Sequence, residues 1–219
     1  MHLAIRHFTI CISKFWTRYF AMLAALYISL ALLAPVLIIA NAQQIAEKLY
    51  AAYSIFCHQN AYKSWYLYPS PNLPGFNLSS SFNNLYKRPL GTFLESREFI
   101  GSVELGWKTA LCHRCTAIYL GVFTASLMYH ILKTRRLHIP ILHPYIYLAG
   151  GLLPISIHTL VAPQSALSFL HFPVIDPYIL RTITGGLFGV MSIWFAFPEI
   201  DRYFQRYISK YSKSGLSSR

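Results

Sequence analysis

The stretch between Arg18 and Glu47 contains no Asp, Glu, Lys or Arg, and this is the feature that most limits how the chain can fold. Its core, Phe20–Ala40, exceeds the roughly 18 apolar residues that cross a bilayer as a helix. Only 12% of all residues are charged, whereas soluble domains carry about a quarter. So few charges cannot cover a globular surface. The sequence therefore predicts an integral membrane protein and argues against a soluble enzyme.

Further uncharged runs predict three more membrane helices. They lie between Arg114 and Lys133, between Arg136 and Asp176, and between Arg181 and Glu199. We expect helices near residues 19–42, 112–133, 144–161 and 178–198. The expected fold is an all-α, polytopic membrane protein with about four transmembrane helices, in which residues 1–219 form a single membrane domain. Because the first apolar run is longer than the usual 7–15 residues of a signal peptide, we interpret it as an uncleaved anchor.

The basic residues predict the orientation of the chain. They gather before the first span, in the loop after the second span and in the C-terminal tail. Since cytoplasmic loops carry an excess of Lys and Arg, both termini are expected in the cytoplasm and residues 58–108 outside it. The expected location is the cell (plasma) membrane, crossed several times. The net charge of +12 is scattered along an apolar chain, so we expect no nucleic-acid partner.

The outer segment 58–108 differs in character from the spans. Within it, residues 64–95 are rich in Pro, Gly, Ser, Asn and aromatic residues, which is typical of an irregular loop. Its aromatic side chains are costly to leave in water. Either they lie on lipid headgroups, or they form a docking surface for another subunit. Expected partners are therefore the lipid bilayer and other membrane subunits, reached through this loop and through helix faces.

Three cysteines and two histidines are expected to meet at the outer end of the helix bundle. Cys57 and His58 follow the first helical region, Cys112 and Cys115 open the second span, and His158 lies near the outer end of the third. Thiolates and imidazoles in such a group are typical zinc ligands. The sequence thus predicts a candidate metal site for zinc or another metal, made of these five residues.

Two other interpretations of the cysteines remain open. Cys112 and Cys115 form a Cys-x-x-Cys pair at a helix start, where the thiol pKa is commonly lowered, and an outward location permits oxidation. This alternative predicts a membrane thiol-disulfide oxidoreductase linked to quinone. In the other interpretation the cysteines are small packed residues without chemistry.

Small residues in the last span predict close helix packing. Gly185 and Gly189 have the spacing of a GxxxG contact motif. Arg181 precedes them at the membrane edge and needs a partner there. The nearest acid in the sequence is Asp176.

Three motifs in order resemble those of a known family, the domain-of-unknown-function family DUF2085 of small microbial membrane proteins. They are Cys57-His58-Gln59, then Cys112-His113-Arg114-Cys115-Thr116 continuing to Gly121, then Leu180-Arg181 continuing to Gly189. The resemblance covers most of residues 45–195 and implies a small helical membrane domain. It brings no established activity.

The chain departs from this family pattern in three places. Ala117 stands where the family usually has Gly, His158 stands where it has Asp, and about thirty residues around 64–95 look inserted. We expect an accessory or structural subunit of a larger membrane complex, for example a respiratory or photosynthetic one, without a catalytic role. The quinone-linked oxidoreductase using Cys112 and Cys115 is the alternative.

Overall fold

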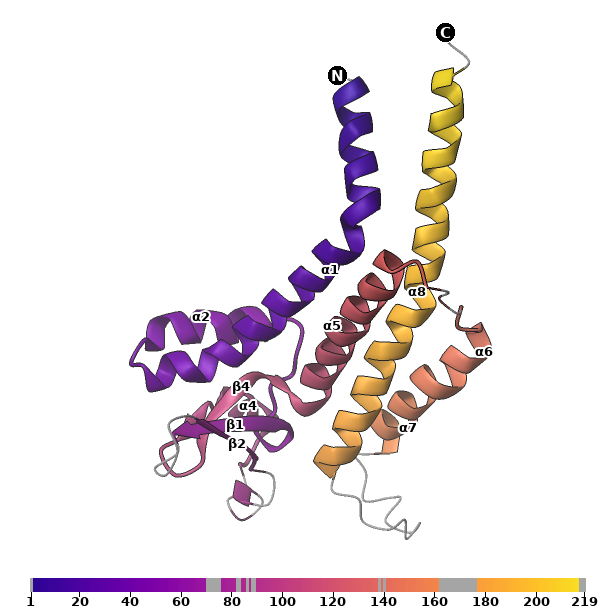
Figure 1. The fold of residues 1–219 in the computed structure, drawn as a ribbon. Helices are drawn as coiled ribbons and strands as arrows, with labels where there is room; N and C mark the ends of the chain where they lie inside the picture. The colour runs from indigo at the N-terminus through magenta and orange to yellow at the C-terminus, as the bar shows by residue number, and fades with distance from the viewer. Residues whose placement is uncertain are drawn as a thin grey trace.

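The computed structural model describes residues 2–69, 76–81, 84–85, 87, 90–137, 139, 141–161 and 177–216. Within this part the protein is mostly helical, with a small sheet at one end (Figure 1). Its larger elements in chain order are α1 (His2–Ile39), α2 (Gln43–Tyr53), η1 (Ala61–Lys63), β1 (Ser64–Pro69), β2 (Phe76–Ser80), α4 (Phe93–Glu98), β3 (Gly101–Ser102), β4 (Gly106–Cys112), α5 (His113–Thr134), α6 (Pro144–Tyr147), η2 (Leu148–Leu152), α7 (Leu153–Val161) and α8 (Pro177–Leu216).

Three helices of the described part are long and apolar enough to cross a membrane. These stretches are Phe15–Ile39 in α1, His113–Thr134 in α5 and Tyr178–Arg206 in α8. They coincide with the first, second and last predicted spans. The remaining predicted span, 144–161, is helical but divided into α6, the five-residue π-helix η2 and α7, so the count of four stays a prediction.

Helices α5 and α8 pack closely through the predicted small residues. A Cβ atom on Gly189 would lie 2.2 Å from the carbonyl oxygen of Ile118, and one on Gly185 would lie 2.6 Å from that of Arg114. No side chain larger than hydrogen fits at such distances, so the predicted close contact is confirmed.

The same contacts fix the relative direction of the two helices. Arg114 lies opposite Gly185 and Ile118 lies opposite Gly189, so α5 and α8 run parallel. Two parallel spans require the chain between them to return to the starting end. The segment α6–η2–α7 descends along α8 in this way (Figure 1), which supports a fourth crossing.

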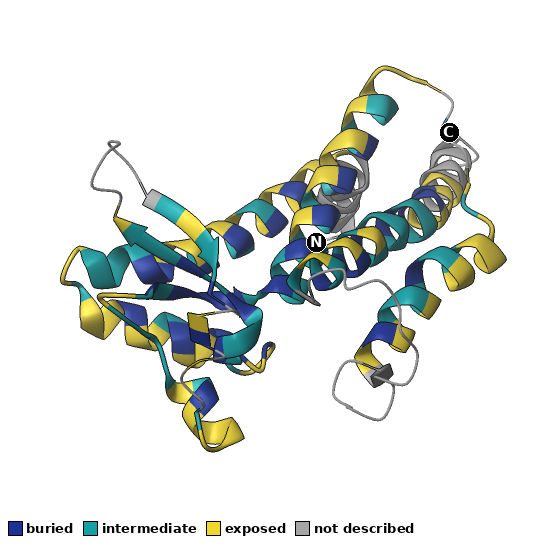
Figure 2. Cartoon of the chain, turned by 90° about the horizontal axis from the view of Figure 1, so that it is seen from below, coloured by how far each residue is buried: buried dark blue, intermediate teal, exposed yellow. Residues whose placement is uncertain are grey.

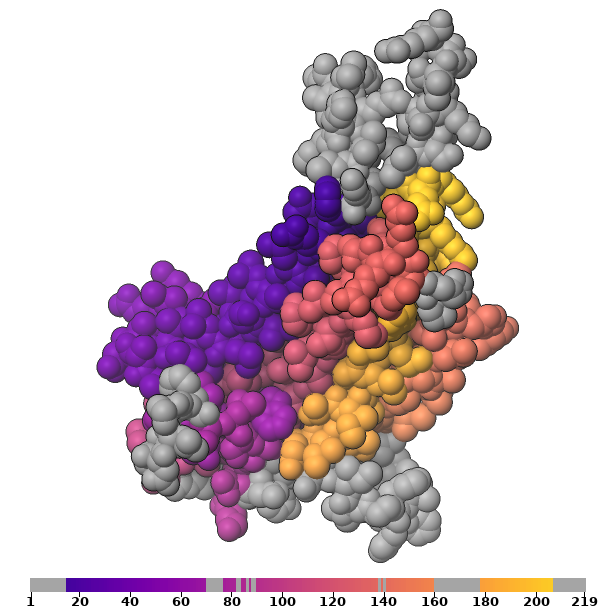
Figure 3. All heavy atoms as spheres, in the orientation of Figure 1, coloured from indigo at the N-terminus to yellow at the C-terminus, as the bar shows by residue number. Residues whose placement is uncertain are grey.

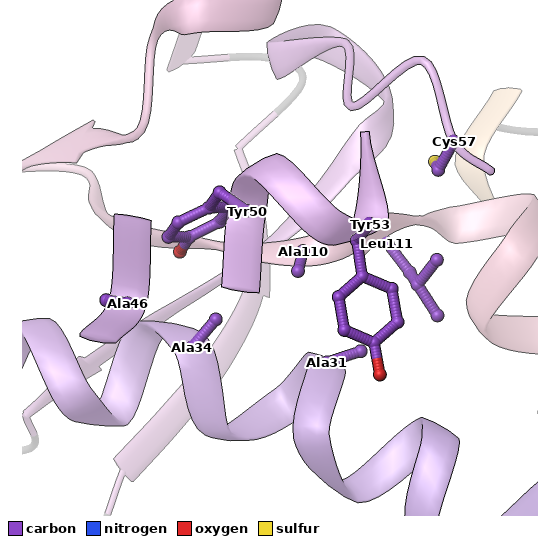
Figure 4. Close-up of a cluster of buried hydrophobic side chains, with 8 residues drawn as sticks. All are labelled: Ala31, Ala34, Ala46, Tyr50, Tyr53, Cys57, Ala110 and Leu111. Carbon is purple, nitrogen blue, oxygen red and sulfur yellow. The ribbon is translucent and has the colours of Figure 1, made fainter. Parts of the chain in front are cut away.

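The first helix turns back on itself at the sheet end. The backbone of Asn41 has a φ of 61°, a left-handed conformation that commonly ends helices. Helix α2 therefore folds back against α1. Ala31 and Ala34 of α1 pack with Ala46, Tyr50 and other residues of α2 and β4 in one buried cluster (Figure 4).

The sheet corrects the all-α prediction and the expected irregular loop over 64–95. Its four antiparallel strands lie in the order β2-β1-β4-β3. Strand β1 pairs with its neighbour β2, and also with the distant β4, where Ser64 faces Cys112. Aromatic residues such as Tyr66, which is fully buried, favour strands because they pack well on a pleated surface.

A buried carboxylate joins three helices away from the sheet, near the C-terminal end of α5. Asp201 of α8 accepts hydrogen bonds from Trp16 Nε1 (2.8 Å), Tyr129 OH (2.9 Å) and Lys133 Nζ (2.6 Å). Trp16 belongs to α1, and the other two donors belong to α5. This network holds the three spanning helices together away from the sheet.

The burial pattern fits a membrane environment. Buried residues lie inside the sheet and between helices, while the outward helix faces are exposed (Figure 2). Large apolar side chains occupy those faces, among them Met22, Leu23, Leu120 and Ile183. In the space-filling view, the sheet, the α1–α2 hairpin and the other helices form one continuous body (Figure 3).

Candidate metal centre

The structure brings the three predicted cysteines together. The sulfur atoms of Cys57, Cys112 and Cys115 all lie within 4.8 Å of one another. Cys57 follows α2, Cys112 is the last residue of β4, and Cys115 lies in the first turn of α5. The prediction that these residues meet despite their separation in the chain is therefore confirmed.

Local structure explains why Cys57 reaches the other two. The amide of Cys57 donates to the carbonyl of Tyr53 at 2.9 Å, so the chain stays coiled beyond the end of α2. Gln59 then adopts a φ of 49°, and its side chain donates to the carbonyl of Tyr50 at 2.8 Å. This bond holds the Cys57 loop against α2, while the pairing of β1 with β4 fixes the position of Cys112.

The thiols of the group interact directly. All three cysteines are free, and Cys57 is buried. The backbone N–H of Cys112 donates to Cys57 Sγ at 3.3 Å. Hydrogen bonds from the thiols of Cys115 and Cys57 hold the pKa of Cys112 well below its usual range. The hydrogen bond with Cys112 raises the pKa of Cys57 to about 11, so Cys112 is the first of these two to become a thiolate.

The donor set fits a zinc ion. Zinc binds thiolate at about 2.3 Å in tetrahedral geometry, which places bound sulfur atoms about 3.8 Å apart. The observed spacing of at most 4.8 Å needs only a small contraction to reach that distance. Three thiolates also suit zinc better than the hard ions Mg²⁺ and Ca²⁺, which prefer oxygen.

The two predicted histidine ligands stand apart from the cysteine group. Among the described residues, the cluster with metal-ligand spacing contains the three cysteines alone. His58 is exposed, and its ring packs edge-on against that of Phe93, with the ring centroids 5.9 Å apart. His158 is buried, and its Nδ1 lies 2.8 Å from an Arg114 nitrogen. Their role as metal ligands stays a prediction.

A cavity of about 280 Å³ adjoins the cysteine group. Cys112 and Cys115 form part of its wall, and the other lining residues are His58, Asn60, Lys63, Phe93, Arg114, Thr159 and Arg181. Three of these residues are cationic, and none of the described lining residues is acidic. Asp176, the acid nearest to Arg181 in the sequence, lies outside the described residues.

Two lysines near the cysteines escaped the sequence analysis. Lys63 lines the cavity, and burial together with the charges of Arg181 and Arg114 lowers its pKa. Lys108 is fully buried; its Nζ donates to the carbonyls of Gln59 (2.9 Å) and Arg97 (2.5 Å). Burial lowers the pKa of Lys108 to about 8, and the neighbouring Cys57 opposes that shift. In the sequence, Lys108 is the one charged residue of the run Gly106–Cys112, and this position could have indicated a buried lysine.

Comparison with known proteins finds a match to one family. Residues 102–195 match the predicted membrane protein family DUF2085. The resemblance drawn from the motifs is thereby confirmed for the second and third motifs, which contain Cys112, Cys115 and Arg181. The first motif, with Cys57, precedes the DUF2085 region. No curated protein and no solved structure gives a significant match to the chain.

Proposed function

We propose that this protein is a multi-pass plasma-membrane protein in which Cys57, Cys112 and Cys115 hold a structural zinc ion. The observation that carries the proposal is the convergence of three free sulfur atoms within 4.8 Å. A bound zinc ion would supply no catalytic chemistry here. It would tie the loop after α2 to the start of α5.

The position of the cysteines supports a clamp. The loop that bears Cys57 closes the α1–α2 hairpin, and Cys112 joins the sheet to the second spanning helix. A metal across these residues links the sheet end to the helix bundle at the point where the chain leaves the sheet. Because the sites that bind such a metal are absent from an unfolded chain, binding free energy adds directly to stability.

Metal analysis of the purified protein tests the proposal. With reductant present, we expect about one zinc per chain, and Cys57→Ser should reduce it to well below one. Cys11→Ser, the same substitution at a cysteine outside the predicted site, is the control and should retain zinc. A parent protein that binds no metal under reducing conditions, after expression with added zinc, would reject the structural zinc site.

We further propose that the protein is an accessory subunit of a larger membrane complex. Support comes from apolar side chains exposed on the sheet end, outside the spanning stretches: Ile55, Phe56, Leu94 and Val103. The described part of 64–95 and its surroundings thus offer a surface for another subunit, with lipid headgroups as the competing occupant.

Native electrophoresis of gently solubilised membranes should show the protein in a particle larger than its own micelle. Val103→Glu should release it, whereas Arg135→Glu, at the other end, should not.

The thiol-disulfide oxidoreductase remains the second candidate because Cys112 and Cys115 both line the cavity. In that reaction the two thiols would lose two electrons and two protons as one S–S bond forms. A quinone would accept both and become quinol. If Cys112→Ser and Cys115→Ser assemble normally yet abolish quinone-linked thiol oxidation, the redox enzyme stands and the accessory subunit fails.

A further inference from the structure

We propose that the cavity beside the cysteine group binds the phosphate group of a small ligand, held by Lys63, Arg114 and Arg181. This inference goes beyond the zinc clamp, which needs no ligand. Three separate elements supply the cations: η1 ends at Lys63, α5 carries Arg114 in its first turn, and α8 carries Arg181. Arginine and lysine together are the side chains that bind phosphate, the first as a planar fork and the second as a point charge.

The cations lack acidic partners in the part of the chain that the structure describes. No carboxylate lines the cavity there, and Arg181 is buried. Positive charges that are gathered and partly removed from water repel one another, and each loses hydration. An anion in the cavity would reduce the repulsion among the cations and replace their lost hydration. The cavity therefore suits an anion better than a neutral ligand.

Thiolates alone do not balance these charges once a metal is bound. Three thiolates around Zn²⁺ carry one net negative charge. The three cations of the cavity exceed it by two. A phosphate group near neutral pH carries between one and two negative charges, because its second pKa is about 6. The charge of the ligand thus matches the remaining charge of the site.

Arg114 is already oriented for such a ligand. Its guanidinium donates to Thr159 Oγ1 at 2.6 Å and lies 2.8 Å from His158 Nδ1, both on α7. Its Nε is buried and has no hydrogen-bond partner among the described residues. A side chain held by two contacts loses little entropy when it binds a ligand, and the Nε–H is a donor still available to a ligand.

The size of the cavity limits the ligand. Its volume of about 280 Å³ lies just below the range of roughly 300–1,000 Å³ that is typical of drug-sized ligands. Exposed His58 and Phe93 form part of the wall, so the cavity opens to the surface. Inorganic phosphate and the headgroup of an anionic phospholipid share the required chemistry, and the experiment separates these two sources.

The test is a calorimetric titration of the full-length protein in a phosphate-free maltoside detergent. One arm uses inorganic phosphate, and the other uses a short-chain phosphatidic acid. Sodium chloride at equal ionic strength is the control. We expect saturable binding of about one ligand per chain in at least one arm. Binding of inorganic phosphate identifies a free ligand, whereas binding of phosphatidic acid alone identifies a lipid headgroup.

Variants decide whether the binding occurs at this site. Arg181→Gln and Lys63→Gln should each weaken it about tenfold, which is the effect of losing one charged hydrogen bond. Lys63→Arg should retain it, and Arg135→Gln, an exposed cation at the other end of α5, should leave it unchanged. Lack of saturable binding in both arms overturns the inference. Equal affinity in Lys63→Gln and the parent protein also overturns it.

Zinc measured on the same samples separates this inference from the proposed function. Zinc-loaded protein without phosphate binding contradicts the phosphate site and leaves the clamp intact. Zinc-free protein that binds phosphate through Lys63 and Arg181 contradicts the clamp and supports the site. Circular dichroism of each variant verifies its fold. If Arg181→Gln unfolds, the Lys63 pair of variants gives the answer alone.

Discussion

The backbone N–H of Cys112 donates a hydrogen bond to the sulfur of Cys57 at 3.3 Å, across 55 residues of chain. Hydrogen bonds of this kind stabilise the charged form of a sulfur that accepts them. They also orient the ligand before a metal arrives, as partners of metal ligands generally do. The link between the α2 loop and the start of α5 therefore exists in the protein fold itself, and a metal would strengthen it.

Chelation should weaken the protein through this link. We expect a strong chelator to lower the melting temperature of the parent protein by several degrees, because the folded state loses the binding free energy of the metal. Cys57→Ser should melt lower than the parent and respond little to the chelator. The measurement is thermal unfolding in detergent with intrinsic fluorescence. A parent protein and a Cys57→Ser variant that respond equally would contradict a metal held by Cys57.

Removing the charge of Asp201 should destabilise the helix bundle. Asp201→Asn leaves the Lys133 ammonium, 2.6 Å away, without its counter-charge. Because the Asp201 side chain is buried while that of Lys133 is 26% exposed, we expect a loss of about 1–3 kcal/mol in the free energy of unfolding in mixed micelles. Arg202→Gln breaks the exposed pair with Glu199 and should cost less than about 1 kcal/mol.

A double substitution checks the cause of that loss. Lys133→Met combined with Asp201→Asn should be less destabilising than the sum of the two single changes, since neither charge is then left alone. Strict additivity would show that Asp201 does not act through Lys133.

The contact between α5 and α8 allows a matched pair of substitutions. Gly189→Ala places a methyl group 2.2 Å from the carbonyl oxygen of Ile118, so the helices must separate. The same change at Gly186 meets its nearest atom, the carbonyl oxygen of Ala117, at 3.8 Å, which is ordinary contact. We expect Gly189→Ala to reduce the free energy of unfolding by about 1–3 kcal/mol and Gly186→Ala to be nearly neutral. Equal effects in the micelle unfolding assay would argue against this helix packing.

Site-directed labelling tests the predicted orientation. Val103 is 90% exposed at the sheet end, and Arg135 is exposed at the end of α5. A membrane-impermeant maleimide added to intact cells should label Val103→Cys and should not label Arg135→Cys. The parent chain sets the background from native cysteines. Labelling of Arg135→Cys alone would place the termini outside and invert the predicted topology.

The long uncharged stretches predicted four spans, and three of them coincide with helices long and apolar enough to cross a bilayer, since length and hydropathy can be read directly from the sequence. The close packing of the last span was also accessible, through the spacing of Gly185 and Gly189, but its partner α5 and the parallel direction come from the structure. The division of 144–161 into short helical pieces was not. The π-helix η2 contains Gly150 and Gly151, and at both positions an added Cβ would crowd a neighbouring side chain. That tight fit depends on tertiary contacts that a one-dimensional pattern does not contain.

The sheet was missed because its decisive partner is remote. Strand β1 is rich in aromatic residues, but the Pro and Gly residues that follow it favoured a loop, and β4 lies some forty residues later. The three cysteines were predicted because span topology brings the relevant chain ends to one level. Lys63 was not, since its place in the cavity follows from the turn η1 and the start of β1. The cavity thus depends on the element that the sequence analysis overlooked.

The small residues Ala31 and Ala34 of α1 tie the sheet to the first spanning helix. Ala31 and Ala34 are buried against Ala46 and Ala110, so a stretch of the first spanning helix also closes the interior of the extramembrane portion. A fragment that starts after α1 would present that interior to water. The sheet is therefore no autonomous soluble module that can be excised and crystallised alone. We therefore expect the sheet to fold only when α1 is present to cover it.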